Sequence, residues 1–496
     1  MPTPLTHPGV YIEEVPSGVR TIAGAVTSTT AFVDVFRRGP VGEAIVVASM
    51  ADVERTFGGL DHRSESSYGL SQYFLNGGTS AVVVRVAPDA ATPASGTVGG
   101  LGVEAVDPGA WGNSIDVSVV VHDGDINLEL RHHADGAVER TERFHDLDTG
   151  GGRRDVRAVV GANSDLVRIT SVAEPVTTSD APIALTGGND GLGPHGADDR
   201  AEAIAVVAAA LSRPDGLDAL THVDTIGLLA LPATAFMSAN DRQSVLAQAA
   251  AFCEARRIFL ITDPPADAAP TDFVADPGAA VTHLSANAAL WYPALTIPDL
   301  LDANRPRVVA PSGTIAGVIA RTDGQRGVWK APAGLAASIR GASPRFDVSR
   351  ADLDRLNPRG LNTIRTFAGR GTFSWGARTL HGADSVASEW KYVPVRRTAL
   401  FIESSLSRGL RFAVFEPNDE PLWAQIRGAV DTFLQQLFRS GAFAGSTSEE
   451  SFFVRCGADT TTRADIDDGV VNVVVGFAPL KPAEFVIVQL RLPAGR

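Results

Sequence analysis

Four kinds of hydrophobic pattern follow one another along this 496-residue chain. In the first, short apolar runs end at Gly, Pro or charged residues. Ala81–Val86 is a continuous apolar run of strand length, which is typical of a buried strand. Ala31–Phe36 and Ala44–Ala48 are further predicted strands, and Ser49 is placed to cap a short helix through Phe57. We expect mixed α and β structure in this first region.

The second pattern alternates with a period of two. It follows a linker around residues 88–102 that is rich in Ala, Pro, Thr and Gly. In Ile115–Val121 and again in Ile126–Leu130, every second residue is apolar. Asp123-Gly124 between them is a hairpin-turn pair, because Gly accepts a positive φ. The pattern predicts an antiparallel meander with one polar face, ending near Thr186.

The third pattern alternates between helix and strand from residue 198 onward. An Ala-rich helix over Asp199–Leu211 is followed by strands and helices in turn. Such alternation predicts a sheet with parallel neighbours and helices on its faces. The predicted strands are Thr225–Leu231, Ile258–Ile261, Ala288–Ile297 and Arg307–Ala310, and the predicted helices start at Asn240 or Asp241 and span Gly313–Ala320.

The last pattern is an amphipathic helix followed by strands. Apolar residues of Pro421–Phe438 recur at spacings of 4, 4, 3 and 4. Phe452–Arg455, Val470–Phe477 and Glu484–Leu490 are predicted strands. From Phe485 onward the final strand is uncharged and apolar, so as a free edge it would aggregate. It therefore pairs within its own sheet or adds to the sheet of a neighbour.

The first 20 residues leave no room for a core and are predicted to form an extended arm. Val10, Tyr11, Ile12 and Val15 lie between Pro-Gly and Pro-Ser-Gly boundaries, as in a short strand. An extended segment of this length reaches roughly 65 Å, at about 3.3 Å per residue, which is far enough to cross onto another subunit. The alternative is a first strand that folds back onto its own sheet.

Composition and charge exclude several classes of function. The net charge is −14, whereas a general nucleic-acid binder needs an excess of Lys and Arg. Two cysteines, Cys253 and Cys456, cannot make a disulfide framework or a Cys-type zinc site. Residues 1–9 have no secretory-signal features, and no apolar run reaches the roughly 20 residues of a membrane span. We expect no nucleic-acid partner, no cofactor and no direct membrane insertion.

Charge is nevertheless segregated along the chain. Residues 339–440 contain 15 Arg or Lys against 10 Asp or Glu, a balance of +5. Such segregation suggests a basic face turned toward an acidic partner. Arg427 and Arg439 lie on the predicted amphipathic helix or at its end. The alternative is a plain surface helix with solvated arginines.

Asp263 and Asp299 are the best candidates for catalytic residues, because both lie at predicted strand ends, where α/β enzymes place catalytic groups. An α/β enzyme in residues 196–330 with a β-rich accessory domain is therefore one interpretation. However, no Gly-x-Ser-x-Gly elbow and no Gly-x-Gly-x-x-Gly loop follows a strand. Turn or helix-cap roles are favoured for both aspartates, and we expect no catalytic residue.

Two further groups could be mistaken for ligand sites. His132, His133 and His145 invite a metal-site interpretation. Adjacent residues of a strand point to opposite faces, so we expect no metal-binding residue here. Gly187–Gly191 is rich in Gly but lacks the Lys-Ser/Thr of a phosphate-binding P-loop.

The densest motif of the chain lies between Asp323 and Leu380. It combines Gly and Pro with Trp, which forms rigid anchors, and with Arg, which can grip a carboxylate at two points. This mixture suits a packed contact surface, and the alternative is a Gly/Pro-rich connection between two domains. The residues singled out are Trp329, Lys330, Pro332, Asn357, Pro358, Arg370, Trp375 and Arg378.

This motif resembles the core segment of contractile phage-tail sheath proteins, which include the short sheaths of phage tail-like contractile injection systems. The similarity continues along nearly the whole chain, in the same order. It covers Pro8–Gly18, Asn76–Val86, Pro108–Asn113, Gly187–Gly191 and Lys391–Arg397, and ends in the C-terminal helix and strands.

The resemblance implies a fold class of α/β and α+β multidomain type. The expected parts are a mixed α/β core, an antiparallel β insertion domain that faces outward, and an α+β C-terminal domain with extended terminal arms. The implied boundaries are 1–20 for the N-terminal arm, 21–95 for the first part of the core, 96–190 for the insertion domain, 191–350 for the α/β core, 351–480 for the C-terminal domain and 481–496 for the C-terminal strand or arm.

It also implies a function. The chain would be a structural subunit that polymerises helically around an inner tube and contracts to drive the tube through a target envelope. Its partners would be other copies, the inner tube, and baseplate and terminal cap proteins. Assembly would occur in the bacterial cytoplasm, within a phage tail or a tail-like particle that lysis can release. A coat or tube protein that does not contract is a further alternative.

The resemblance assigns roles to two more sets of residues. Strands in the arms would complete a sheet of adjacent subunits, and the C-terminal helix, with Arg427 and Arg439, would face the inner tube. The arm residues are Val10, Tyr11, Ile12, Val15, Phe485, Val486, Ile487 and Val488.

Overall fold

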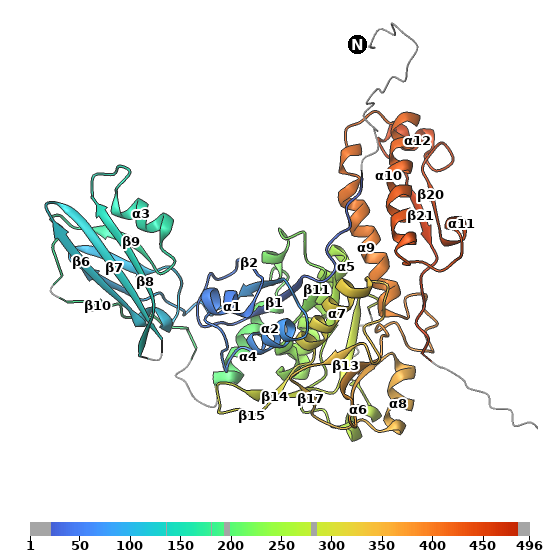
Figure 1. Cartoon of the computed structure of the whole chain (residues 1–496), viewed down its shortest axis with the longest axis horizontal. Helices are drawn as coiled ribbons and strands as arrows, with labels where there is room; N and C mark the ends of the chain where they lie inside the picture. Colours follow the sequence, from blue (N-terminus) through green and yellow to red (C-terminus); the bar gives the residue numbers. More distant parts are fainter. Residues whose placement is uncertain (1–20, 135, 180, 193–198, 279–284, 485–496) are drawn as a thin grey trace, which may run out of the picture. The chain divides into compact units, whose positions relative to one another are not determined.

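The computed structural model describes residues 21–134, 136–179, 181–192, 199–278 and 285–484 (Figure 1). The chain divides into two compact units. We call Val26–Leu400 with Lys481–Arg496 the core unit, and Met1–Ala25 with Phe401–Leu480 the C-terminal unit. The boundary between them falls within helix α9 (Val393–Gly409). None of the helices in the described ranges is long and apolar enough to cross a membrane.

A nine-stranded mixed sheet forms the centre of the core unit. Its strand order is β16-β19-β18-β13-β12-β11-β1-β3-β2. The pairs from β3 to β18 are parallel, whereas the outer pairs are antiparallel. The strands are β1 (Thr30–Asp34), β2 (Ala44–Val47), β3 (Ala81–Arg85), β11 (Leu228–Ala230), β12 (Phe259–Thr262), β13 (Ala288–Tyr292), β16 (Ser338–Ile339), β18 (Asn362–Phe367) and β19 (Gly371–Trp375).

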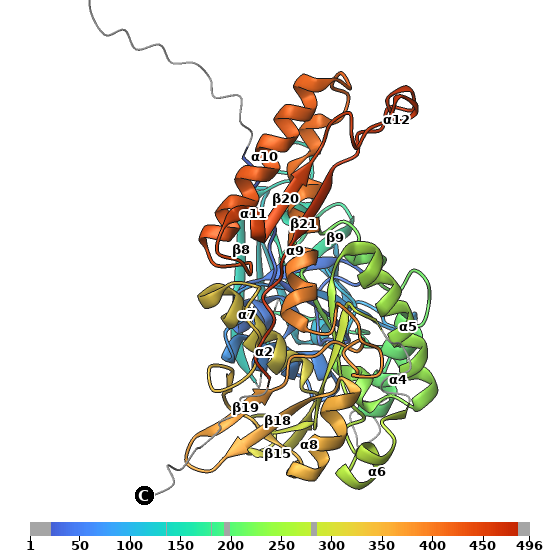
Figure 2. The same ribbon diagram turned by 90° about the vertical axis from the view of Figure 1, so that its right-hand side faces the viewer.

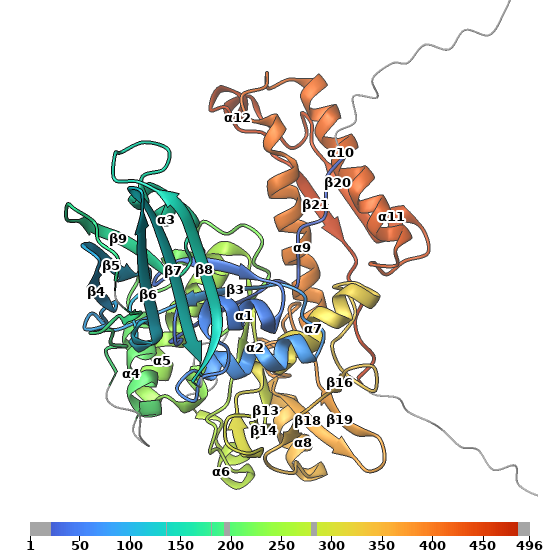
Figure 3. The same cartoon turned by 60° about the vertical axis from the view of Figure 1, so that its left-hand side comes forward.

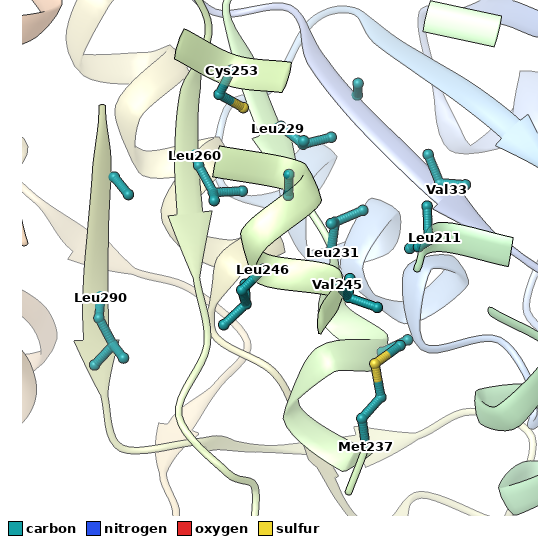
Figure 4. Close-up of a cluster of buried hydrophobic side chains, with 14 of the residues drawn as sticks. Val33, Leu211, Leu229, Leu231, Met237, Val245, Leu246, Cys253, Leu260 and Leu290 are labelled. Carbon is teal, nitrogen blue, oxygen red and sulfur yellow. The ribbon is translucent and has the colours of Figure 1, made fainter. Parts of the chain in front are cut away.

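Helices cover both faces of this sheet. Successive residues of a strand point to opposite sides, so each strand places apolar side chains against both layers of helices. Ala31 and Val33 pack on one side, and Phe32 between them packs on the other. Figure 4 shows the first side, where Val245 and Cys253 of α5 lie with Leu229 and Leu260 of the sheet. The helices are α1 (Met50–Phe57), α2 (Glu65–Leu75), α4 (Asp199–Leu211), α5 (Ala239–Arg256), α6 (Pro270–Ala275), α7 (Ser312–Arg326) and α8 (Arg350–Leu356).

Two predictions for this sheet were wrong. The single strand expected over Ala288–Ile297 is two strands, β13 and β14 (Leu295–Asp299), in different sheets. Pro293 lies between them and lacks the N–H that a continuous ladder would need. β14 pairs instead with β15 (Arg305–Val309) and β17 (Ser343–Pro344). The structure also places the boundary expected at residue 350 elsewhere, because β18 and β19 are strands of the core sheet.

The predicted antiparallel meander is confirmed (Figure 3). β6 (Ile115–His122), β7 (Asp125–Ala134) and β8 (Ala137–Leu147) pair in sequence, with β10 (Ile183–Ala184) beside β6. Their apolar face packs with a second sheet and with α3 (Val156–Asn163) in one hydrophobic cluster. The second sheet is β4 (Ser95–Val98), β5 (Leu101–Ala105) and β9 (Val167–Val172), so part of the expected linker is strand.

The C-terminal unit is built on α10 (Glu420–Arg439), the predicted amphipathic helix. Its buried residues include Leu422, Ile426, Val430, Phe433 and Leu437, which confirms the predicted apolar face. Helix α10 packs against β20 (Phe452–Arg455), which pairs with β21 (Val474–Phe477) (Figure 2). Two short helices, α11 (Ser448–Ser451) and α12 (Arg463–Asp467), complete the unit.

Candidate assembly site

Three of the predicted motif segments meet at Arg378, which follows β19 and is 1% exposed. Its backbone is fixed by Asn362, the first residue of β18. The Arg378 N–H donates to Asn362 Oδ1 at 2.7 Å, and Asn362 Nδ2 donates to the Arg378 carbonyl at 2.8 Å. A buried arginine needs several acceptors, because desolvation penalises its charge.

The guanidinium of Arg378 finds these acceptors in a set that we call the Arg378 clamp. Nε and Nη2 each donate to a different oxygen of Glu484 at 2.7 Å, in two-point geometry. Nη1 donates to the Asn357 carbonyl at 2.8 Å and to Asp384 at 3.0 Å. Tyr392 donates to Glu484 at 3.1 Å. Burial works against the charge of Arg378, but the two carboxylates raise its pKa above the usual value.

Glu484 is the residue immediately before the segment 485–496. The clamp therefore fixes Glu484, the last described residue before that segment, to the rest of the core unit. Residues Phe485, Val486, Ile487 and Val488, predicted as arm strands, lie outside the described residues, as do Val10, Tyr11, Ile12 and Val15.

The N-terminal segment has a corresponding anchor, made by Thr27, Asp323 and Arg397. Arg397 donates to both oxygens of Asp323, at 2.8 and 2.7 Å, and to the Thr27 carbonyl at 2.8 Å. The Thr27 hydroxyl donates to Asp323 at 2.7 Å. The side chains of Arg397 and Asp323 are 3% and 5% exposed. Arg397 belongs to a motif that was singled out from the sequence. No local pattern marks Asp323 or Glu484 as ion-pair residues, because their partners lie 74 and 106 residues away.

The other motif residues do not converge on one place. Trp329 and Lys330 lie in the turn after α7, where Trp329 packs so closely on Gly327 that a Cβ there would lie 2.3 Å from the ring. Lys330 donates to the Ala331 carbonyl at 3.1 Å, and burial lowers its pKa. Trp375 is 38% exposed on β19. Three residues remain: Pro332 is buried, whereas Pro358 and Arg370 are exposed.

The sheet of β20 and β21 has free edges among the described residues. Each strand has one hydrogen-bonded neighbour, and Phe453 and Val474 are 49% and 44% exposed. A two-stranded sheet is marginally stable by itself, and its open edges are templates for further strands.

The two arginines predicted to face a tube are in different situations. Arg427 donates to Glu420 at 2.6 Å and to the Cys456 carbonyl, so it holds α10 to the end of β20. Arg439 is exposed and forms no ion pair with any described residue. Of the two, Arg427 is tied into the unit and Arg439 is not paired with a described residue; the tube-facing role of both stays a prediction.

The Gly-rich motifs around residues 110 and 190 meet in space. Asp190 accepts from the Ala110 N–H at 2.9 Å and from Arg63 at 2.8 Å, and Arg63 also pairs with Asp61 at 2.8 Å. Asn113 exchanges two hydrogen bonds of 2.8 Å with the backbone of Gly188. These contacts tie the start and the end of the β-rich insertion to the core.

The predicted turn and cap roles of the two aspartates are confirmed. Asp263 accepts from the Ser312 N–H at 2.8 Å, at the start of α7, and burial raises its pKa to about 7. Asp299 accepts from the Leu301 N–H at 2.9 Å and from the Tyr68 hydroxyl at 2.7 Å. Asp299 is therefore held by two structural hydrogen bonds, whereas Asp263 Oδ1 accepts a hydrogen bond and its buried Oδ2 has no hydrogen-bond partner among the described residues.

The three histidines form separate pairs. His132 lies 2.9 Å from Glu139, His133 lies 2.9 Å from Asp116, and His145 lies 3.1 Å from Asn127. Within the described part of the chain, no three His, Cys, Asp or Glu side chains are grouped so that they could hold a metal ion.

Comparison with known proteins yields a consistent set of matches. Residues 385–492 match the family model of the phage tail sheath C-terminal domain. The tail sheath protein of Vibrio phage KVP40 is 32% identical over 185 residues, which cover 37% of this chain and 26% of that protein. The match thus spans about a quarter of that relative's length.

Solved structures match over nearly the whole chain. The anti-feeding prophage helical sheath in its contracted state is 26% identical, with a TM-score of 0.60, over 98% of this chain and 99% of that chain. The sheath of an extracellular contractile injection system, PVC, is 23% identical, with a TM-score of 0.61, over 99% and 98%. These findings confirm the predicted resemblance to contractile sheath proteins and the multidomain fold, and the matched family is a structural one.

Proposed function

We propose that this chain, which has the fold of contractile tail sheath proteins, is the subunit of a contractile sheath. Many copies would polymerise into a helix around an inner tube and shorten to drive the tube through a target envelope. The observation that carries the proposal is a pairing of features. Buried ion pairs hold Glu484, which borders the C-terminal segment, and Thr27, near the N-terminal segment. The sheet of β20 and β21 offers free edges among the described residues.

Donor and acceptor elements on one chain suit a homopolymer. A terminal strand such as Phe485–Leu490 would pair with a free edge of β20 or β21 in the next copy, as in strand-addition recognition. The donor and acceptor are different surfaces, so each contact is head-to-tail and propagates into an open helix. The clamps would transmit force from the strand to the core unit, because they are buried and doubly bonded.

Contraction would draw on free energy stored in the assembly. The chain carries no P-loop motif for nucleotide binding. The extended sheath would be metastable, held by a kinetic barrier, and its release would let subunits rotate as rigid bodies into tighter contacts. The terminal segments would act as tethers that keep the lattice connected during that change.

The inner tube would contact the C-terminal unit through Arg439, which is exposed and forms no ion pair with any described residue. Baseplate and terminal cap proteins would be the other partners. Assembly in the bacterial cytoplasm, with release by lysis, agrees with the relatives being phage tail and tail-like components.

Electron microscopy of the purified chain, expressed with and without its neighbouring genes, tests the proposal. We expect hollow rods of two kinds, long and thin or short and wide. Rods of a single length and diameter under all triggers would indicate a static coat. Monodisperse globular particles under every condition would overturn the proposal.

A deletion tests the role of the arms. Removal of Met1–Gly18 should leave a folded, soluble subunit that no longer polymerises, because it lacks a connecting strand. Circular dichroism and gel filtration check the fold, and microscopy checks assembly. Normal rods from this variant would refute the arm hypothesis.

Arg439→Ala should keep the fold and weaken tube binding, whereas Arg427→Ala should destabilise the C-terminal unit, because Arg427 bonds Glu420 and the Cys456 carbonyl.

A further inference from the structure

The hairpin of β18 and β19 presents a face of aromatic side chains that the described residues leave partly open (Figure 2). Opposed residues of a hairpin share a face, so Phe373, opposite Arg365, and Trp375, opposite Thr363, point to the same side. The ring centroid of Phe367 lies 4.7 Å from that of Trp375 and 5.9 Å from that of Phe373. Trp375 is 38% exposed and Phe367 is half-buried. We call Phe367, Phe373 and Trp375 the aromatic face.

The other face and both edges of β19 are occupied. Ile364, on the other face, is buried in the core, and the Trp291 indole donates to the Ser374 hydroxyl at 3.0 Å. β19 lies between β18 and β16 in the sheet. The turn of residues 334–337 continues the β16 edge, because Ser374 accepts from the Gly334 N–H at 2.9 Å and donates to the Ala337 carbonyl at 3.0 Å. A partner of this hairpin would therefore lie across the aromatic face rather than extend the sheet.

The C-terminal segment begins close to this face. Arg378 lies three residues after Trp375, so their Cα atoms are at most roughly 10 Å apart, at about 3.3 Å per residue. Arg378 holds both carboxylate oxygens of Glu484, and the apolar run Phe485–Leu490 follows at once. Extended, this run measures roughly 20 Å, and β19 roughly 17 Å, at about 3.3 Å per residue.

The run and the aromatic face are complementary liabilities. Phe485–Leu490 contains no charged residue, and a free strand of this kind aggregates. An open aromatic surface marks an interaction site for the same reason, since water leaves it at a gain in free energy. Each can cover the other without any change in the described fold.

We propose that, in the unassembled subunit, Phe485–Leu490 lies across the aromatic face of its own chain. The tether at Glu484 selects the chain's own segment over that of another copy. Two sites joined by a short linker meet at an effective concentration in the millimolar range, about 1,000-fold above a micromolar concentration of separate subunits. The aromatic face thus holds an aggregation-prone strand until assembly removes it. The contact itself does not depend on the proposed function, whereas its release on assembly rests on that function.

Photo-crosslinking of unassembled subunits tests the contact. p-Benzoylphenylalanine replaces Trp375, and equal amounts of ¹⁵N-labelled and unlabelled chains are mixed at low micromolar concentration and irradiated. Circular dichroism checks the fold. We expect crosslinks from residue 375 to residues 485–490, each within a single isotope. Crosslinks of mixed isotope content would assign the face to a second copy. That result, crosslinks to other regions only, or none at all would overturn the proposal.

Quenching of Trp375 fluorescence by acrylamide is a second readout that keeps this side chain. The difference between a chain and its Trp375→Phe variant isolates the signal of this residue. Ile487→Asp with Val488→Asp places a charge on the aromatic face whichever side of the strand faces it, because adjacent residues point to opposite sides. The ratio of bound to free segment should fall at least about tenfold, and Trp375 should become more readily quenched.

Ala494→Asp with Gly495→Asp is the matched control, because it adds the same two charges beyond the apolar run. It should leave the quenching of Trp375 as in the unmodified chain. Equal quenching in the two double variants would refute the contact.

The release step is read from the lag before rods appear. Trp375→Ser weakens the hold on the segment, so the lag should shorten, and an unchanged lag would overturn the holding role. If the unmodified chain forms no rods at all, the sheath function fails, while the crosslinks and the quenching still decide the contact within the subunit.

Discussion

Replacement of Arg378 by Met is the sharpest test of the clamp that anchors the C-terminal segment. Met keeps the length and the apolar packing but removes the charge and all five donors. The variant loses the two-point pair with Glu484 and the bond to the Asn357 carbonyl. Breaking a buried ion pair costs about 3–5 kcal/mol. The side chain of Glu484 is 17% exposed and can be partly rehydrated, so we expect the lower end, about 3 kcal/mol.

Scanning calorimetry and hydrogen exchange measure two sides of this effect. For the transition of the core unit, a loss of about 3 kcal/mol corresponds to a fall in Tm of about 4 °C, because the unfolding entropy of so large a unit is about 0.8 kcal/mol/K. Amide exchange should increase near residue 484, because the root of the C-terminal segment is released. Glu484→Gln keeps one acceptor for Arg378 and should cost about 1 kcal/mol.

Arg370→Met is the matched control, because Arg370 is exposed and forms no ion pair with a described residue. It should change the stability by less than about 0.5 kcal/mol. If Arg378→Met and Arg370→Met gave the same Tm and the same exchange near residue 484, the clamp would contribute nothing and the reasoning would be wrong. A double variant, Arg378→Met with Glu484→Gln, should be no worse than Arg378→Met alone, because the two residues act as a pair.

Three other predictions follow from buried contacts. Gly317→Ala should destabilise the core unit by about 2–3 kcal/mol, because the added Cβ would lie 2.5 Å from the Tyr73 carbonyl oxygen of α2. Gly324→Ala on the same helix is the control: its Cβ would meet no atom within 4 Å, so it should stabilise the core unit by about 0.5–1 kcal/mol. Denaturant unfolding measures both free energies. The pKa of Asp263 is raised to about 7 in the folded protein, against about 3.9 in the unfolded chain, so the stability of the protein falls as pH rises from 4 to 7. Asp263→Asn removes this charge, so its free energy of unfolding should exceed that of the unmodified chain by up to about 4 kcal/mol at pH 8 and by nothing near pH 4. Tm measured against pH checks this. Asp190→Ala should lower the free energy of unfolding by about 2–4 kcal/mol and raise amide exchange at Ala110, because it removes the bonds of Asp190 to Arg63 and to the Ala110 N–H. Unchanged exchange would argue against a role of Asp190 in tying the insertion to the core.

The sequence alone determined the elements whose signal is local. The period of two over Ile115–Leu130 and the turn at Asp123-Gly124 were sufficient to predict the meander, because hairpin pairing depends on neighbouring residues. The apolar spacing of Pro421–Phe438 predicted α10 and its buried face for the same reason. The motif order along the chain predicted the resemblance to contractile sheath proteins, and the comparisons confirmed that resemblance.

Which motif residues act together depends on how distant segments pack in the folded chain. Arg378 bonds Glu484 across 106 residues, and Arg397 bonds Asp323 across 74, so no periodicity or local spacing can pair them. The same limit applies to β18, which joins the core sheet through a parallel pairing with β13. Such contacts depend on the packing of distant segments and on where a buried charge finds its acceptors. Those are properties of the folded chain rather than of any stretch of it.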